Sequence, residues 1–137
     1  NTLTKYNNIS GTIVDNKTQL ELSDDAAHVN WGGSWRMPTY AEMTELHEQC
    51  IWSWTTQNSI NGYKVTSKSN GNSIFLPAAG YRGGSSLQDA GSSGRYWSSS
   101  LDTDSPKIAY ELYFGSDYVY SSSNYRDYGR SVRPVCP

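Results

Sequence analysis

The sequence has little of what several common classes of protein function require. No apolar run approaches the roughly 20 residues of a membrane-spanning helix, so we expect no direct insertion into a membrane. Lys and Arg number 11 against 13 Asp and Glu, and the net charge of -2 argues against a nucleic-acid partner, which normally needs a basic surface. His28 and His47 have no second ligand at metal-binding spacing and lie near no nucleophile motif. We therefore expect no metal, no cofactor and no enzymatic activity.

Cysteine is also scarce, and the two cysteines stand far apart in the sequence. Cys50 and Cys136 fit neither a zinc cluster nor a CxxC redox motif. A disulfide and two buried thiols are the alternatives. We expect the disulfide, because closing so long a loop would stabilise the fold by roughly 4 kcal/mol. A disulfide in turn indicates an oxidising setting outside the cytoplasm.

The length of 137 residues predicts a single domain spanning residues 1–137. The chain begins at Asn1 without a signal peptide, as expected of a mature or trimmed chain that is the C-terminal domain of a longer protein. We expect the isolated domain to be monomeric.

Two helices are predicted in the first third of the chain. The segment from Ser23 to Asn30 starts with a capping residue and two acidic residues, and Gly32-Gly33 ends it. The second helix begins at Thr39, which forms a capping box with Glu42. Apolar residues at helical spacing then continue to Cys50.

The rest of the chain has the alternation and the turn residues of β-strands. Trp52 and Trp54 point the same way and are expected to fill the core, with a sugar-stacking platform as the alternative. Asn70-Gly71 predicts a hairpin, whereas the stretch from Gly83 to Gly94 has the composition of a surface loop. With two helices, the pattern predicts an α+β fold. The expected strands lie within 1–22, at 50–55, 62–66, 73–76, 96–100, 108–114 and 118–120, and, after a loop over 121–128, in a last segment that ends at Val135.

The C-terminal third concentrates tyrosine beyond what folding requires. From Tyr113 to Tyr128 only Phe114 and Val119 are apolar, and the other residues are Tyr, Ser, Asp, Asn, Gly or Arg. This is the composition of an antibody paratope, in which Tyr supplies contact area and Ser, Gly and Asn supply adaptable hydrogen bonds. We interpret the segment as a binding surface. The alternative is a sheet whose aromatic side chains simply pack on one another.

Several motifs resemble, in the same order, those of a known bacterial group. They are Trp31-Gly-Gly-Ser-Trp-Arg-Met-Pro-Thr39, Gly62-Tyr-Lys-Val-Thr66, Asn72-Ser-Ile-Phe-Leu-Pro-Ala-Ala-Gly-Tyr-Arg82, Tyr96-Trp-Ser-Ser-Ser100 and Gly129-Arg-Ser-Val-Arg-Pro-Val135. The chain resembles a large paralogous family of bacterial surface domains with a C-type-lectin-like fold, related in architecture to formylglycine-generating enzymes. The resemblance implies two short N-terminal helices packed on small antiparallel sheets, with a C-terminal half made mainly of strands and loops.

The C-terminal third is also similar to the variable proteins of diversity-generating retroelements. In such proteins, errors at template adenines randomise selected Asn codons, which never become Lys, Glu, Gln, Met or Trp. The segment from Leu112 to Val135 contains none of these five types. The resemblance implies a scaffold made of Leu112, Phe114, Val119, Gly129, Val132, Arg133 and Val135. The candidate ligand contacts are then the residues that alternate with the scaffold or lie in loops: Arg95, Tyr113, Gly115, Asp117, Tyr118, Tyr120, Ser122, Asn124, Tyr125, Asp127 and Tyr128.

The resemblance implies a non-catalytic ligand-binding domain, an adhesin or receptor-binding domain. We expect it outside the cell or at a surface, on a pilus tip, an outer-membrane-anchored protein or a phage particle, with a protein or glycan on another cell or host surface as its partner. The calcium motif of sugar-binding C-type lectins and the catalytic cysteine pair of formylglycine-generating enzymes have no match in this sequence. A carbohydrate-binding module of fixed specificity is the alternative, and a degenerate enzyme of the formylglycine-generating type is a third hypothesis.

Overall fold

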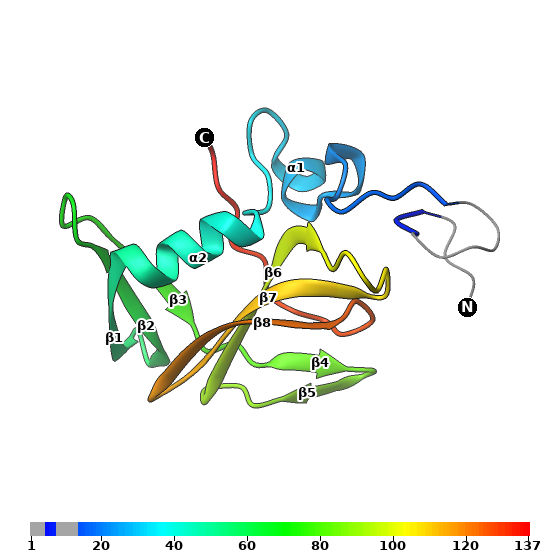
Figure 1. The fold of residues 1–137 in the computed structure, drawn as a ribbon. Coiled ribbons are helices and arrows are strands. Elements are labelled where there is room, and N and C mark those ends of the chain that lie inside the picture. The colour runs from blue at the N-terminus through cyan, green and yellow to red at the C-terminus, as the bar shows by residue number, and fades with distance from the viewer. Residues whose placement is uncertain (1–4, 8–13) are drawn as a thin grey trace.

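The computed structural model describes residues 5–7 and 14–137, which form an α+β fold of short helices and small antiparallel sheets (Figure 1). The strand orders within the sheets are β1-β2-β3, β4-β5 and β6-β7-β8. The elements in chain order are a 3-10 helix (Leu22–Asp24), α1 (Ala26–Trp31), α2 (Tyr40–Gln49), β1 (Cys50–Gln57), β2 (Ile60–Ser67), β3 (Ser73–Pro77), β4 (Tyr81–Gly83), β5 (Ser86–Gln88), β6 (Ser93–Leu101), β7 (Ile108–Gly115) and β8 (Tyr118–Tyr125).

Local sequence signals set the ends of both α-helices. Asp25, rather than Ser23, caps α1, because its carboxylate accepts hydrogen bonds from two backbone N–H groups of the first turn. Gly32 ends this helix with a φ of 66°, a left-handed value that glycine adopts without strain. The predicted start of α2 is confirmed, because Thr39 and Glu42 form the capping box.

The main core lies between α2 and the two three-stranded sheets. The ring of Phe114 is completely buried, and Trp52 and Trp54 of β1 pack against it with ring centroids 6.1 and 6.5 Å away. Tyr63 of β2 meets both tryptophans edge-on at 5.4 and 5.2 Å. The prediction that these tryptophans fill the core is thus confirmed. The other buried members of this cluster are Met43, Val65, Leu76, Ala78, Tyr96 and Leu112.

The β6-β7-β8 sheet has an inner face against α2 and an outer face on its opposite side. Residues directly opposed in an antiparallel ladder share a face, so the register assigns every side chain. Leu112 and Phe114 of β7, with Val119 of β8, lie on the inner face. Tyr40 of α2 stacks on Tyr110 there, with ring centroids 4.3 Å apart. Alternate residues of the same strands form the outer face.

One end of the outer face is covered by the N-terminal segment. Tyr6 packs there with Leu101 and Ala109 in a second buried cluster, against which Leu20 and Trp97 lie half-buried. The remainder of the outer face, toward the β7–β8 turn, is not part of this cluster. The N-terminal segment therefore divides one sheet face into a covered part and an open part.

The C-terminal segment after β8 ties separate elements together. Gly129 forms a bridge with Arg82 in β4, Ser131 bridges Tyr96 on β6, and Val135 bridges Arg36 ahead of α2. The continuous last strand predicted to end at Val135 is therefore wrong, because these residues pair singly with three different partners. These bridges hold the segment on the domain.

The structure corrects the predicted disulfide, since Cys50 and Cys136 are both free thiols. Cys50 follows the last residue of α2, whereas Cys136 follows Val135, whose bridge partner Arg36 precedes the helix. The 10 residues of α2 extend over about 15 Å. A disulfide requires Cα atoms within about 7 Å. The length of the helix thus separates the two thiols.

Other strand predictions need correction. The expected loop from Gly83 to Gly94 contains β5 and is part of the β4-β5 ribbon, and the expected loop over 121–128 is strand as far as Tyr125. Strands were also expected within residues 1–22, but residues 1–4 and 8–13 of this range lie outside the described part of the chain. Gln19 forms only an isolated bridge, with Ser100.

Candidate ligand-binding surface

The register of β6, β7 and β8 brings seven of the eleven predicted contacts onto the outer face. Tyr113 is opposed to Arg95 on one side and to Tyr120 on the other. Alternation then places further predicted contacts on the same face, which we call the tyrosine face. The tyrosine face consists of Arg95, Tyr113, Tyr118, Tyr120, Ser122 and Asn124.

The tyrosine rings of this face are packed in series. Tyr113 and Tyr118 stand at 5.1 Å between ring centroids, and Tyr118 stacks on Tyr120 at 5.4 Å with an angle of 20° between the rings. The hydroxyl oxygens of Tyr113 and Tyr118 lie 2.5 Å apart in a hydrogen bond. That hydrogen bond, together with burial, raises the pKa of Tyr118 to about 12. Tyr120 remains 56% exposed at the end of the series. The series is thus ordered internally and open at one end.

A buried cluster of charges lies next to these rings. Glu111 of β7, whose side chain is fully buried, accepts a hydrogen bond from Arg95 Nη1 at 3.0 Å. Its other oxygen lies 2.6 Å from Arg130 Nε, an ion pair without hydrogen-bond geometry. Burial lowers the pKa of Arg130, and the charge of Glu111 opposes this shift. Two guanidinium groups therefore share one buried carboxylate.

Aromatic rings surround both guanidinium groups. The central carbon of Arg95 lies 3.8 Å from the ring centroid of Tyr113 and 4.8 Å from that of Tyr81. Arg130 lies 4.7 Å from the ring of Tyr81 and 4.8 Å from that of Tyr128. Such cation–π contacts stabilise a guanidinium group that has been removed from water. Tyr81 contacts both arginines and so joins β4 to the tyrosine face.

The bridges of the C-terminal segment explain the position of Arg130. Gly129 and Ser131, on either side of it, are fixed to Arg82 and Tyr96. The indole Nε1 of Trp97 also donates to the carbonyl oxygen of Tyr128 at 3.3 Å. The buried arginine is therefore held by backbone contacts of its neighbours.

Gly115 also lies on the outer face, opposed to Tyr118, but it is buried. A Cβ atom there would stand 2.5 Å from the ring of Tyr118, so the glycine makes room for that ring. Asp117 is exposed in the β7–β8 turn, and Tyr125 is opposed to Ile108 and belongs to the inner face by register. Asp127 and Tyr128 follow β8.

The sequence did not predict four further residues of this site, which are Glu111, Arg130, Tyr81 and Trp97. Their chain positions are widely separated, and only the sheet register and the bridges of the C-terminal segment bring them together. The signal available in the sequence was the acidic residue at position 111 in the middle of an apolar strand. A carboxylate in such a position needs a charged partner.

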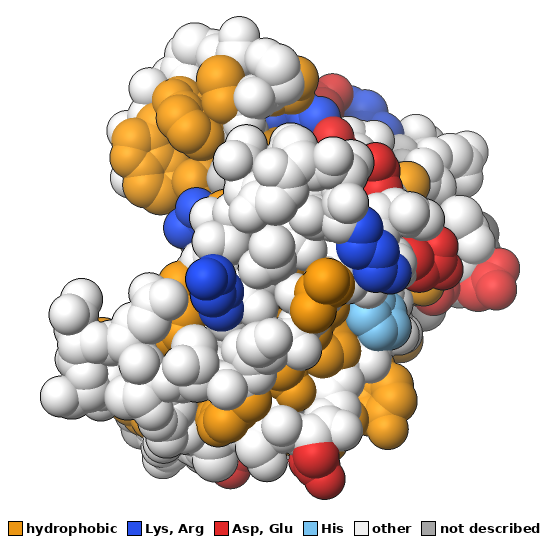
Figure 2. Space-filling model, turned by 90° about the vertical axis from the view of Figure 1, so that its left-hand side faces the viewer, with side chains coloured by type: hydrophobic (Ala, Val, Ile, Leu, Met, Phe, Trp, Pro, Cys, Tyr) orange, Lys and Arg blue, Asp and Glu red, His pale blue; other side chains and the backbone are white. Residues whose placement is uncertain are grey.

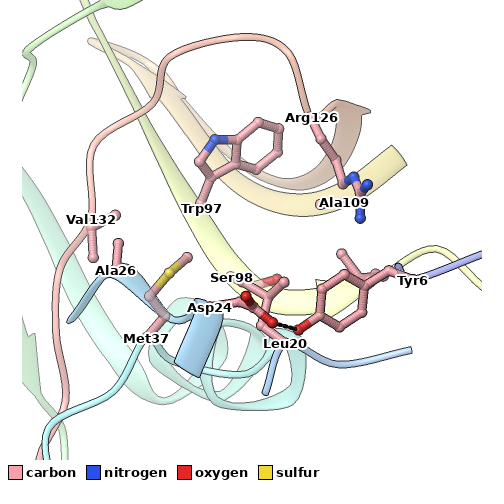
Figure 3. A pocket seen from close by; sticks show the side chains of 11 residues that line it. Tyr6, Leu20, Asp24, Ala26, Met37, Trp97, Ser98, Ala109, Arg126 and Val132 are labelled. Atoms are coloured by element: carbon pink, nitrogen blue, oxygen red, sulfur yellow. Dashed lines mark hydrogen bonds between the residues drawn. The ribbon is translucent and has the colours of Figure 1, made fainter. Parts of the chain in front are cut away.

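A cavity of about 350 Å³ lies over the covered end of the outer face (Figure 3). Figure 3 shows Trp97 and Arg126 across the cavity from Leu20 and Asp24. Asp24 accepts a hydrogen bond from the hydroxyl of Tyr6. Burial lowers the pKa of Arg126. The cavity is lined by none of the predicted contact residues.

Exposed apolar side chains also occur away from the tyrosine face. Figure 2, which views the side that carries the β1-β2-β3 sheet, shows hydrophobic side chains in separate groups, the largest at the top. Among the large exposed side chains are Trp31 and Trp35, which line a common depression with Pro134. What distinguishes the tyrosine face is therefore its stacked and hydrogen-bonded rings, since exposed aromatic residues occur elsewhere too.

The described residues contain neither a metal-binding cluster nor a membrane-spanning helix. No group of three or more His, Cys, Asp or Glu side chains there is arranged to hold a metal ion. No helix there has the length and apolar character needed to cross a membrane.

Comparison with known proteins gives one match. The model of a family described as a domain of unknown function, DUF8237, matches residues 39–135, which is most of the chain and includes strands β1 to β8. No curated protein matches. No solved structure matches either.

Proposed function

The chain belongs to the DUF8237 family, whose function is unknown, and we propose that it is a non-catalytic ligand-binding domain that binds through the tyrosine face. In this proposal the domain acts as an adhesin or receptor-binding module outside the cell or at a surface. Its partner is a protein or glycan on another cell or host surface. We also propose that the α+β scaffold is a C-type-lectin-like fold and that the tyrosine face is diversified by a retroelement.

The observation that carries the proposal is the ring series of the tyrosine face. A tyrosine that serves only to build a core is buried, as Tyr63 and Tyr96 are at 5% and 4% exposure. Tyr113 and Tyr118 are half-buried and Tyr120 is exposed, yet all three are ordered by contacts with one another. Large side chains that are ordered before binding lose little conformational entropy on contact with a ligand. This supports a binding role over a purely structural one.

A comparison of two libraries tests the proposal. In one library, codons 118, 120, 122 and 124 of the tyrosine face are randomised. In the control library, the inner-face residues Tyr96, Leu112, Phe114 and Val119 are randomised. Both are displayed on yeast and scored for resistance to protease. We expect most tyrosine-face variants, and few inner-face variants, to remain folded, because only the second set fills the core. Equal loss of folding in the two libraries would contradict the proposal.

Retroelement diversification has its own test. Sequencing of the gene across a population of its source should find substitutions concentrated in codons 113–128, beside an adenine-rich near-repeat. If codons 113–128 do not vary, retroelement diversification is ruled out and the tyrosine face is a surface of fixed specificity.

The second candidate, a carbohydrate-binding module of fixed specificity, rests on Tyr120. Its 56% exposure leaves aromatic surface available for stacking on a sugar. A glycan array probed with the wild-type domain and with Tyr120→Ala, each with and without calcium, separates the candidates. A calcium-independent signal that Tyr120→Ala removes would favour the carbohydrate module. Binding to a protein receptor alone would favour the first proposal.

A further inference from the structure

The cluster of Arg95, Glu111 and Arg130 beside the rings of the tyrosine face carries a surplus of positive charge. Among the described residues, Glu111 is the only carboxylate within ion-pair distance of Arg95 or of Arg130. Residues 1–4 and 8–13, outside the described part, contain no acidic side chain in their sequence. One negative and two positive charges therefore leave a local charge of +1, in a chain whose net charge is -2.

The surplus charge resides on Arg95. The side chain of Arg130 is 1% exposed and lies 2.6 Å from the carboxylate, so the fully buried Glu111 neutralises it first. An unpaired ion that deep would be too costly to retain. Arg95 is 15% exposed and forms the longer contact, at 3.0 Å. It is thus the cation of the cluster that a ligand can reach.

The aromatic rings fix the direction in which Arg95 can bond. Tyr113 and Tyr81 stand at 3.8 and 4.8 Å from its guanidinium carbon. Nη1 donates to Glu111, while Nε is closed to solvent and has no partner in the described residues. Nη2 is the nitrogen that remains for a ligand. A guanidinium held in this way has already lost its rotational freedom before binding.

The hydroxyls of Tyr113 and Tyr118 supply a neutral O–H donor that suits an anionic oxygen. In the hydrogen bond between Tyr113 and Tyr118, one hydroxyl uses its proton and the other keeps its proton free. The pKa of Tyr118, raised to about 12, keeps the hydroxyl of Tyr118 protonated at neutral pH. A neutral O–H beside a cation attracts an anionic oxygen and does not repel it.

We propose that the ligand of the tyrosine face presents an anionic oxygen group, a carboxylate or a sulfate, to Nη2 of Arg95. This inference rests on the proposed function, since it assumes that the tyrosine face is the contact surface. It names the chemistry at the centre of the contact, with Tyr118 and Tyr120 as the surrounding aromatic surface.

Anion titration of the ¹⁵N-labelled domain tests the inference directly. Sodium acetate and sodium sulfate are the probes, with sodium chloride at equal ionic strength as reference, and the arginine Nε–H resonances are followed by NMR. Arg36, already bonded through both Nη atoms to Glu42, is the internal control. We expect a saturable shift of the Arg95 signal with acetate or sulfate but not with chloride. An Arg95 signal that does not move, or that moves in parallel with Arg36, would overturn the inference.

The two probes separate the possible sources of the anion. A lower apparent Kd for acetate indicates a carboxylate, as on an acidic peptide or an acidic sugar, and a lower one for sulfate indicates a sulfated ligand. Arg95→Gln should weaken binding of the better anion about 10- to 100-fold, the range for a hydrogen bond to a charged group. Arg133→Gln, which removes the same charge from an exposed position, should leave it unchanged. Equal weakening in both variants would overturn the inference.

Circular dichroism checks that Arg95→Gln is folded. If it is not, the wild-type titration with its Arg36 control decides the question alone. The inference and the proposed function can fail separately. If the tyrosine face tolerates randomisation but the Arg95 signal does not respond to anions, only the inference of an anionic ligand is overturned. If the tyrosine face does not tolerate randomisation, the proposed function is overturned, whatever the titration shows.

Discussion

The two faces of β7 are equally buried near its middle but are built from opposite chemistry. On the inner face, Leu112 and Phe114 are enclosed by apolar and aromatic side chains, and no charge is needed. On the outer face, Glu111 is just as inaccessible but depends on two arginines. Burial of the first kind stabilises through removal of apolar surface from water. Burial of the second kind requires every charge to be matched. The inner face fixes the fold. The outer face presents the one positive charge, on Arg95, that Glu111 does not neutralise.

Removing the largest inner-face side chain should have the greatest effect. Phe114→Ala deletes a fully buried ring that contacts Trp52, Trp54, Tyr63 and Tyr96. We expect a loss of about 3–5 kcal/mol in the free energy of unfolding, measured by urea denaturation. A loss below about 1 kcal/mol would mean that this face is not the core.

Removing the outer-face carboxylate should lower the free energy of unfolding by a similar or slightly smaller amount, for a different reason. Glu111→Gln leaves Arg130 buried without a counter-charge, and we expect a loss of about 3–5 kcal/mol. The matched control is the double variant Glu111→Leu with Arg130→Met, in which the charges leave together. It should recover most of the loss in the same urea experiment. A double variant as unstable as Glu111→Gln would show that the packing, not the charge, is decisive.

An exposed ion pair sharpens the contrast with the buried one. The hydrogen bond from Arg36 lowers the pKa of Glu42 to about 2, from 4.5. Because the folded state has the lower pKa, this contribution is present above about pH 4.5 and is lost as the pH falls toward 2. The side chain of Glu42 is 39% exposed, so we expect less than about 1 kcal/mol. The measurement is the stability difference between wild type and Glu42→Gln at pH 5.5 and at pH 2.5. A difference that does not shrink in acid would contradict the assignment.

The smallest effect on stability is expected at the tyrosine face. Tyr120→Ala removes an exposed ring outside both buried clusters, and we expect a change within about 0.5 kcal/mol. Urea denaturation of this variant beside Phe114→Ala gives the comparison in one experiment. Destabilisation by several kcal/mol would identify Tyr120 as a structural residue and remove the basis of the binding proposal.

The parts of the fold that could be predicted are those with local signals. The capping box at Thr39 and Glu42 and the Asn70-Gly71 hairpin are each encoded within a few residues. The alternation around Phe114 likewise placed Tyr113 and Tyr120 opposite the core. These predictions needed no information about distant residues.

The parts that could not be predicted depend on distant partners. The serines of β8 have little preference for strand, and pairing with β7 extends the strand to Tyr125. The turn between β1 and β2 uses Asn58 and Ser59, both at positive φ, and its Ser gives a weaker hairpin signal than Asn-Gly. The cluster of Arg95, Glu111 and Arg130 exists only after the sheet and the C-terminal segment have formed. No local pattern encodes it.

The bridges of the C-terminal segment also determine the order in which the domain can be completed. Val135 pairs with Arg36 and Ser131 with Tyr96, so these contacts join residues far apart in the sequence. Closing such long loops is slow compared with forming a helix or hairpin. During synthesis, Glu111 leaves the ribosome before Arg130, so the nascent sheet holds a carboxylate with only Arg95 to pair with. The domain therefore reaches its final state only after residue 135 has emerged.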